Sequence, residues 1–243
     1  MSSFYLKTQV TRYVVLFVER SGSTYLATLL DSHPDIKALR EQFAVLIQQG
    51  KGAEDQLNWA RNFYTHPLLG RYKSYGFKTK LVDILDRQGF ARLLEEKNCR
   101  VITLYRRNSV KAVISTINAK RLYEASGNWN LLDEKNRQSS FEIDPTEFGE
   151  LLEERQTWDQ ELEAYSSQLN TPKIKLFYED LLQNEQELLD KVFAHIKVKP
   201  RPVQGKTLKH TKDNLREVIT NFDQLRYRYV GTVYEQMFDE VLV

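Results

Sequence analysis

The first candidate site is a short loop of small and hydroxyl-bearing residues that follows an apolar run. The loop comes directly after residues 13–18 and precedes a second apolar stretch. Small residues let successive backbone N–H groups converge, and a helix N-terminus adds positive potential, so such a loop suits a phosphate group. The alternative is a turn with an ordinary Ser/Thr helix cap. The predicted phosphate-binding residues are Arg20, Ser21, Gly22, Ser23, Thr24 and Tyr25.

This loop lacks the residues of an ATP- or GTP-hydrolysing P-loop. Such a loop needs a Lys before its final Ser or Thr, and an acidic residue after a neighbouring strand to hold Mg²⁺. Here Ser23 precedes Thr24, and the apolar run 101–105 is followed by Arg106 and Arg107. We therefore expect a nucleotide that is bound and not hydrolysed, with an ATP-dependent P-loop kinase as the disfavoured alternative.

A second anion site is predicted at Arg107 and Ser115. If a helix begins near Ser109, Ser115 lies about two turns into it, and Arg107 at its start can share one anion with Ser115. The alternative is that these arginines pair with helix carboxylates.

The elements that must position these residues follow from the hydrophobic pattern. Short runs rich in β-branched and aromatic residues predict strands at 13–18, 75–78, 101–105 and 174–178. Longer amphipathic segments predict helices at 81–96, 110–123, 146–168 and 181–196. Strands that alternate with helices indicate an α/β fold, with a central parallel sheet covered by helices and ligands at the carboxyl ends of the strands. Segments 125–145 and 197–211 are expected to be irregular, and the tail from 213 to 243 helical.

Length and charge indicate one folded domain over residues 1–243. The chain is 41% hydrophobic, and its 35 basic and 33 acidic residues leave a net charge of +2, which argues against binding nucleic acid or a membrane by overall charge. No apolar run approaches the roughly 20 residues of a membrane helix, and the N-terminus lacks a secretory pattern. A cytoplasmic protein without stable membrane insertion is therefore expected, and a homo-oligomer is left open.

Disulfide and metal chemistry are not expected. The single cysteine, Cys99, excludes an intramolecular disulfide. No pair of the four histidines has the i, i+4 spacing of a metal-binding helix, so no residue is assigned to a metal.

Together these segments resemble the sulfotransferases that use 3′-phosphoadenosine 5′-phosphosulfate (PAPS). The loop from Arg20 resembles their 5′-phosphosulfate loop, and Arg107 and Ser115 have the spacing of their 3′-phosphate element. Phe177-Tyr-Glu-Asp-Leu181 is similar to a recurrent segment of the family. The resemblance covers about residues 13–185 and implies a P-loop-like three-layer fold, with Tyr178 at the nucleotide. PAPS would be the co-substrate and 3′-phosphoadenosine 5′-phosphate (PAP) the product, with no metal.

Within this family, the sequence resembles the bacterial carbohydrate sulfotransferases that act on nodulation factors and trehalose glycolipids. These have Arg in the first loop and a Glu after the first helix, which here is Glu41. The resemblance implies that Glu41 is the base, that Arg20 and Lys78 are catalytic, and that the acceptor is a hydroxyl of a sugar, a glycolipid or another small molecule. Animal relatives have a His base where Lys80 stands, and a protonated lysine is a poor base.

The C-terminal segment 197–243 resembles the part of the family that closes on the nucleotide. It places Lys206 and Lys209 near the 3′-phosphate, with a solvated basic loop as the alternative. A non-catalytic protein of the same fold, holding a nucleotide or a partner, is the third hypothesis. The aromatic residues Trp59, Tyr64, Tyr123 and Trp129 are candidates for an acceptor groove or for helix packing, and 125–145 for a lid.

Overall fold

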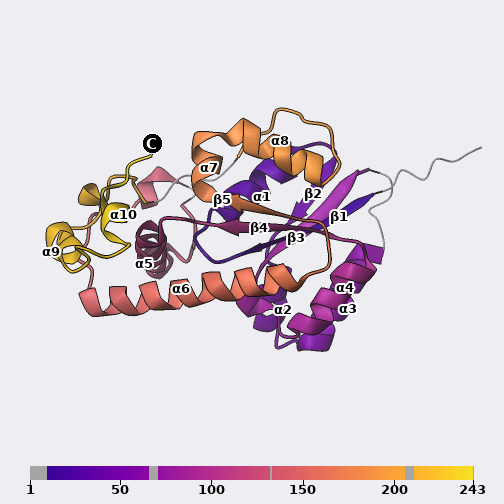
Figure 1. Cartoon of the computed structure of the whole chain (residues 1–243), viewed down its shortest axis with the longest axis horizontal. Coiled ribbons are helices and arrows are strands. Elements are labelled where there is room, and N and C mark those ends of the chain that lie inside the picture. The colour runs from indigo at the N-terminus through magenta and orange to yellow at the C-terminus, as the bar shows by residue number, and fades with distance from the viewer. Residues whose placement is uncertain (1–9, 66–70, 132, 206–210, 243) are drawn as a thin grey trace, which may run out of the picture.

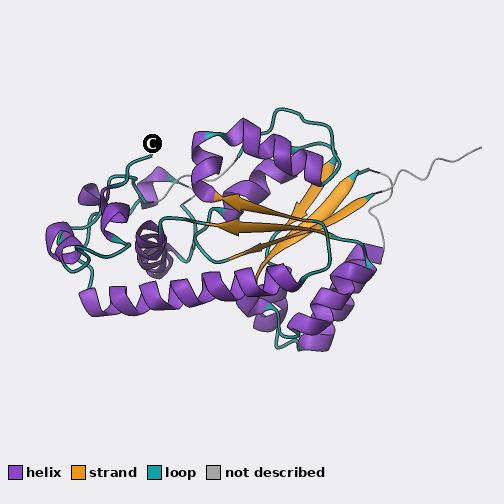
Figure 2. Cartoon of the chain, viewed as in Figure 1, coloured by secondary structure: helices purple, strands orange, loops and turns teal. Residues whose placement is uncertain are grey.

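A five-stranded parallel sheet forms the centre of the protein (Figure 1, Figure 2). The computed structural model describes residues 10–65, 71–131, 133–205 and 211–242. The strand order is β2-β3-β1-β4-β5. The bounds are β1 (Thr11–Phe17), β2 (Ile36–Leu39), β3 (Ser74–Lys80), β4 (Arg100–Tyr105) and β5 (Lys173–Phe177). The predicted parallel sheet and its four predicted strands are confirmed, whereas the short edge strand β2 was not predicted.

Helices cover both faces of the sheet, which confirms the three-layer α/β fold. Alternate residues of β1 point to opposite faces, so Val14 and Leu16 enter one hydrophobic cluster and Val15 and Phe17 the other. One face packs against α1 (Ser23–Ser32), α7 (Tyr178–Gln183) and α8 (Glu185–His195). The other packs against α2 (Gln42–Gln48), α3 (Ala53–Thr65), α4 (Arg87–Glu96) and α6 (Pro145–Gln168).

A third hydrophobic cluster lies beyond the carboxyl ends of the strands. It joins α5 (Ser109–Ser126) and the start of α6 to the C-terminal segment, which holds α9 (Phe222–Tyr227) and α10 (Glu235–Asp239). A buried ion pair of 3.0 Å between Lys111 and Asp213 adds to this contact. In Figure 1, α6 extends from the sheet to this third cluster, so one helix packs against both.

Two predicted helices are interrupted, and the tail is less regular than expected. The segment 81–96 begins with a 3-10 turn at Leu81–Asp83, and Asp86 then caps α4 by accepting the Gly89 N–H at 2.8 Å. The segment 181–196 divides into α7 and α8 at Asn184. The tail forms short helices joined by turns. No helix in the ranges that the structure describes is long and apolar enough to cross a membrane.

Candidate functional site

A cavity of about 340 Å³ lies at the carboxyl ends of β1, β4 and β5. It brings together side chains from three segments that the sequence predicted separately: the loop before α1, the start of α5 and the end of β5. The lining residues are Arg20, Gly22, Ser23, Thr24, Tyr25, Arg106, Ser115, Asn130, Tyr178, Leu181, Leu182, Glu185 and Thr211. Seven of the predicted site residues are therefore in one place, and the volume suits a nucleotide-sized ligand.

The loop before α1 has the backbone shape of an anion-binding nest. Arg20 and Gly22 have positive φ angles of 58° and 79°. A Cβ at Gly22 would lie 2.3 Å from the ring of Tyr178, so glycine is required by both conformation and space. The first backbone hydrogen bond of α1 is donated by the Leu26 N–H to the Gly22 carbonyl. No described residue accepts a hydrogen bond from the backbone amides of residues 23–25. These amides are free to bind an anion.

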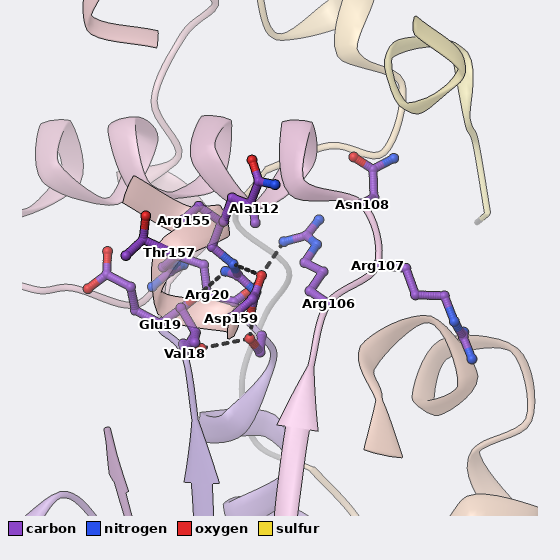
Figure 3. Close-up of polar contacts among 12 residues, drawn as sticks. Val18, Glu19, Arg20, Arg106, Arg107, Asn108, Ala112, Arg155, Thr157 and Asp159 are labelled. Carbon is purple, nitrogen blue, oxygen red and sulfur yellow. Dashed lines mark hydrogen bonds and ion pairs between the residues drawn. The ribbon is translucent and has the colours of Figure 1, made fainter. Parts of the chain in front are cut away.

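Two arginines hold the carbonyl groups of the same loop (Figure 3). Arg155 of α6 donates to the Glu19 carbonyl at 2.7 Å and to Ser21 Oγ at 3.2 Å, and Arg106 donates to the Arg20 carbonyl at 3.2 Å. Because these cations bind the carbonyls, the loop is fixed with its amides available. Arg155 was not predicted, since the helical pattern does not show that the single arginine of α6 turns inward.

Arg20 reaches across the cavity to α5. Its Nε donates to Ser115 Oγ at 3.1 Å, and its Nη1 donates to the Trp129 carbonyl at 3.4 Å. Burial lowers the pKa of Arg20, while the neighbouring Glu19 opposes that shift. Arg20 and Ser115, predicted at two anion sites, therefore contact each other in one cavity.

Arg107 is not among the residues that line the cavity, and its predicted contact with the 3′-phosphate stays a prediction. Its guanidinium lies outside the cavity, bound to both carboxylate oxygens of Asp180 at 2.7 and 3.0 Å, and it covers the Phe177 ring. These hydrogen bonds raise the pKa of Arg107, and its side chain is 48% exposed. The pairing of a strand-end arginine with a helix carboxylate, the alternative weighed above, is what the structure contains.

Arg106 occupies the cavity instead. Consecutive side chains at a strand end point in opposite directions, so only one of the two arginines can face α1 (Figure 3). Arg106 is 9% exposed, lies over the Tyr178 ring at 4.8 Å and has an Nε that no described residue accepts from. Burial lowers its pKa. A buried cation with an unused donor is suited to an anionic ligand.

Lys78 and Glu41 meet at the start of α1. Lys78 of β3 pairs with Val15 of β1 on the face that α1 covers, and its side chain is 2% exposed. Its Nζ donates to Ser23 Oγ at 3.1 Å, Thr24 Oγ1 at 2.9 Å and Glu41 Oε1 at 2.8 Å. Burial lowers the pKa of Lys78, and the Glu41 carboxylate opposes that shift.

Glu41 reaches this position through the strand that the sequence did not reveal. It follows β2, which pairs with β3 so that Leu39 lies beside Phe77. Its side chain is one-third exposed, so one part contacts the ammonium of Lys78 and the rest faces solvent. The base predicted from the resemblance thus lies beside the predicted catalytic lysine.

Further charges lie near Glu41. Lys80 Nζ is 3.8 Å from Asp83 Oδ2, and this oxygen accepts no hydrogen bond from the part of the chain that is described. Burial raises the pKa of Asp83; Lys80 opposes this shift, and the negative charges of Glu41 and Glu19 add to it. Across the described ranges, no group of three or more His, Cys, Asp or Glu side chains is placed to hold a metal ion.

Two predicted residues lie outside the described residues: Lys206 and Lys209. Of the C-terminal segment, Thr211 lines the cavity, and a Cβ at Gly205 would lie 2.1 Å from the Tyr25 ring. Closure of this segment on a nucleotide stays a prediction, as does a lid at 125–145. Tyr64 is fully buried in the core, Trp59 packs against the same hydrophobic cluster, and neither is among the residues that line the cavity.

Comparisons with known proteins give low similarity. No protein-family model and no curated protein matches the chain. A sulfotransferase domain from the curacin biosynthetic pathway is 16% identical, with 95% of this chain and 90% of that chain covered and a TM-score of 0.47. A sulfotransferase from Alicyclobacillus acidocaldarius is 13% identical, with 96% and 97% covered and a TM-score of 0.49. At these values the likeness adds nothing to what the sheet and the cavity show directly.

Proposed function

We propose that the protein is a sulfotransferase that moves the sulfuryl group of PAPS to a hydroxyl of a carbohydrate or glycolipid. The observation that carries this proposal is the placement of Lys78. Its ammonium bridges the hydroxyls of the anion loop and the carboxylate of Glu41, all within 3.1 Å. A cation for the transferred group and a base for the accepting hydroxyl are therefore adjacent.

The cavity offers complementary groups to a PAPS molecule. The free amides at the start of α1, together with Arg20 and the unused Nε of Arg106, supply donors for phosphate and sulfate oxygens. Ser115 lies in the same cavity and adds a hydroxyl. Leu181 and Leu182 supply an apolar wall suited to a nucleobase.

The transfer itself requires charge stabilisation and a proton acceptor. The acceptor oxygen would bond to sulfur while the bond from sulfur to the bridging oxygen of PAP breaks, and the electron pair of that bond stays on PAP. Arg20, Lys78 and the loop amides stabilise the negative charge on the departing phosphate oxygens. The proton of the hydroxyl passes to Glu41, whose side chain is one-third exposed and therefore accessible to an acceptor.

Thermal stabilisation by PAP, compared with ATP and Mg²⁺, tests this function without knowledge of the acceptor. PAP at about 100 times its Kd adds about 2.7 kcal/mol to the free energy of unfolding, which raises Tm by roughly 5–10 °C. A preference for ATP with Mg²⁺ would identify the kinase instead. Stabilisation by PAP without any PAPS turnover, in the presence of sugar acceptors, would identify a non-catalytic nucleotide-binding protein.

A further inference from the structure

Two large aromatic side chains are stacked on the surface of the protein. The rings of Tyr123 and Trp129 lie 4.5 Å apart at an interplanar angle of 15°. Tyr123 is 44% exposed and Trp129 52% exposed. Face-to-face stacking covers one face of each ring and leaves the other free, which matches these exposed fractions. An exposed pair of this size is a feature that burial of the core does not explain.

Both residues of this aromatic pair belong to segments that also contribute to the cavity. The carbonyl of Trp129 accepts a hydrogen bond from Arg20 at 3.4 Å, and the next residue, Asn130, lines the cavity. Tyr123 lies on α5, the helix that carries Ser115 into the cavity. At 1.5 Å per residue, the eight residues from Ser115 to Tyr123 place the aromatic pair about 12 Å along that helix.

The surroundings of the pair are polar. Asn128 and Asn130 flank Trp129 in the chain, and Glu124 next to Tyr123 is exposed. A sugar ring has an apolar C–H face and hydroxyls around its edge, so an exposed flat aromatic face followed in the chain by an amide that lines the cavity complements it. A hydrocarbon tail would instead require a continuous apolar groove to bury its length.

We infer that Tyr123 and Trp129 form a platform for a sugar ring of the acceptor, an inference that rests on the proposed function. Tyr123 lies about 12 Å along α5 from Ser115, and neither aromatic residue is among the hydrogen-bond partners of Lys78, so we assign the stacked ring to a sugar next to the one that receives the sulfuryl group. The acceptor is therefore an oligosaccharide, free or attached to a lipid, and its stacked ring lies at a distance from the reacting hydroxyl.

An array of free and lipid-linked glycans, probed with the PAP-saturated protein, tests this inference. We expect the wild type to bind glycans of two or more rings, and Trp129→Ala and Tyr123→Ala each to weaken that binding at least tenfold. Trp129→Phe, which retains a flat ring, should restore most of it. Tyr227→Ala, which removes an aromatic ring that is 79% exposed on α9, is the matched control and should bind as the wild type does.

Stabilisation of each variant by PAP separates this inference from the proposed function. Trp129→Ala keeps the carbonyl that contacts Arg20, so the increase in Tm with PAP should equal that of the wild type. A wild type that is stabilised by PAP and binds no glycan overturns the platform while the proposed function stands. Equal glycan binding by wild type and Trp129→Ala overturns it too, as does loss of PAP stabilisation in that variant.

Discussion

Arg106 and Arg155, which are buried and hold the carbonyls of the anion loop, form what we call the floor of the site, whereas Glu41 and Trp129, which contact Lys78 and Arg20 and are a third to a half exposed, form its mouth. A buried group with fixed partners keeps its geometry before a ligand arrives, which suits a donor that is the same in every cycle. Exposed groups can contact a variable partner. The difference between floor and mouth suggests that the fold preorganises donor binding and that acceptor choice depends on a few surface side chains.

The largest effect on catalysis is expected from Lys78→Met, at the boundary between floor and mouth. The substitution keeps an unbranched side chain at this buried position and removes the charge beside Ser23 and Thr24. Loss of one preorganised donor typically lowers the rate about 10²–10³-fold. Single-turnover measurement of PAPS consumption gives the rate, and a melting curve verifies the fold. A folded variant within threefold of the wild-type rate would remove Lys78 from the mechanism.

Glu41→Gln is expected to lower turnover while it leaves the binding of PAP unchanged. Removal of the base lowers kcat by about 10²-fold, since general base catalysis contributes at least that much. The affinity for PAP should stay unchanged, because Glu41 is not among the residues that line the cavity. Titration calorimetry with PAP and steady-state kinetics measure the two quantities. Full turnover by this variant would show that another group takes the proton.

The two arginines after β4 should differ in their effect on PAP binding. Arg106→Gln removes a cation from the cavity. This should weaken the binding of PAP by roughly 1.5–3 kcal/mol, which raises its Kd about 10- to 150-fold. Arg107→Gln breaks an exposed ion pair with Asp180 and should change Kd by less than about fivefold. Calorimetry on both variants measures the difference. A larger loss of PAP affinity in Arg107→Gln than in Arg106→Gln would assign the 3′-phosphate to Arg107, as the sequence predicted.

The smallest effect is expected from Asp83→Asn, which concerns stability. Burial raises the pKa of Asp83, so its ionised form costs folding free energy at neutral pH. The folded state binds the proton more tightly than the unfolded state, and this cost is therefore absent once the pH falls below the ordinary value near 3.8. Asp83→Asn should raise Tm by about 2 °C at pH 7, with the gain decreasing as the pH falls. If the rise in Tm stayed the same from pH 7 down to the ordinary pKa near 3.8, the effect would have a cause other than the charge of Asp83.

Local sequence was sufficient for the central strands and for the anion loop. The run 13–18 is continuously apolar because β1 is buried on both faces, and Gly22 marks the turn into α1. Ser115 was predicted from its spacing to Arg107 in the expected helix, whereas Tyr178 was assigned through the family resemblance of the segment that follows β5. These features depend on neighbours in the chain, so they can be read from a single sequence.

Features that depend on tertiary contacts could not be predicted. β2 has four residues and includes a lysine, so it carries too little pattern to be recognised, yet it positions Glu41. The choice between Arg106 and Arg107 depends on the direction of one side chain at a strand end. Arg155 enters the site from a helix more than 130 residues away in the chain.

A crystal structure of the protein with PAP tests the proposed function most directly, because it does not depend on the acceptor. We predict that one phosphate of PAP accepts hydrogen bonds from the amides at the start of α1, that Arg106 contacts PAP, and that Arg107 stays bound to Asp180. PAP bound elsewhere, or no PAP at concentrations that saturate sulfotransferases, would contradict both the assignment of the cavity and the proposed reaction.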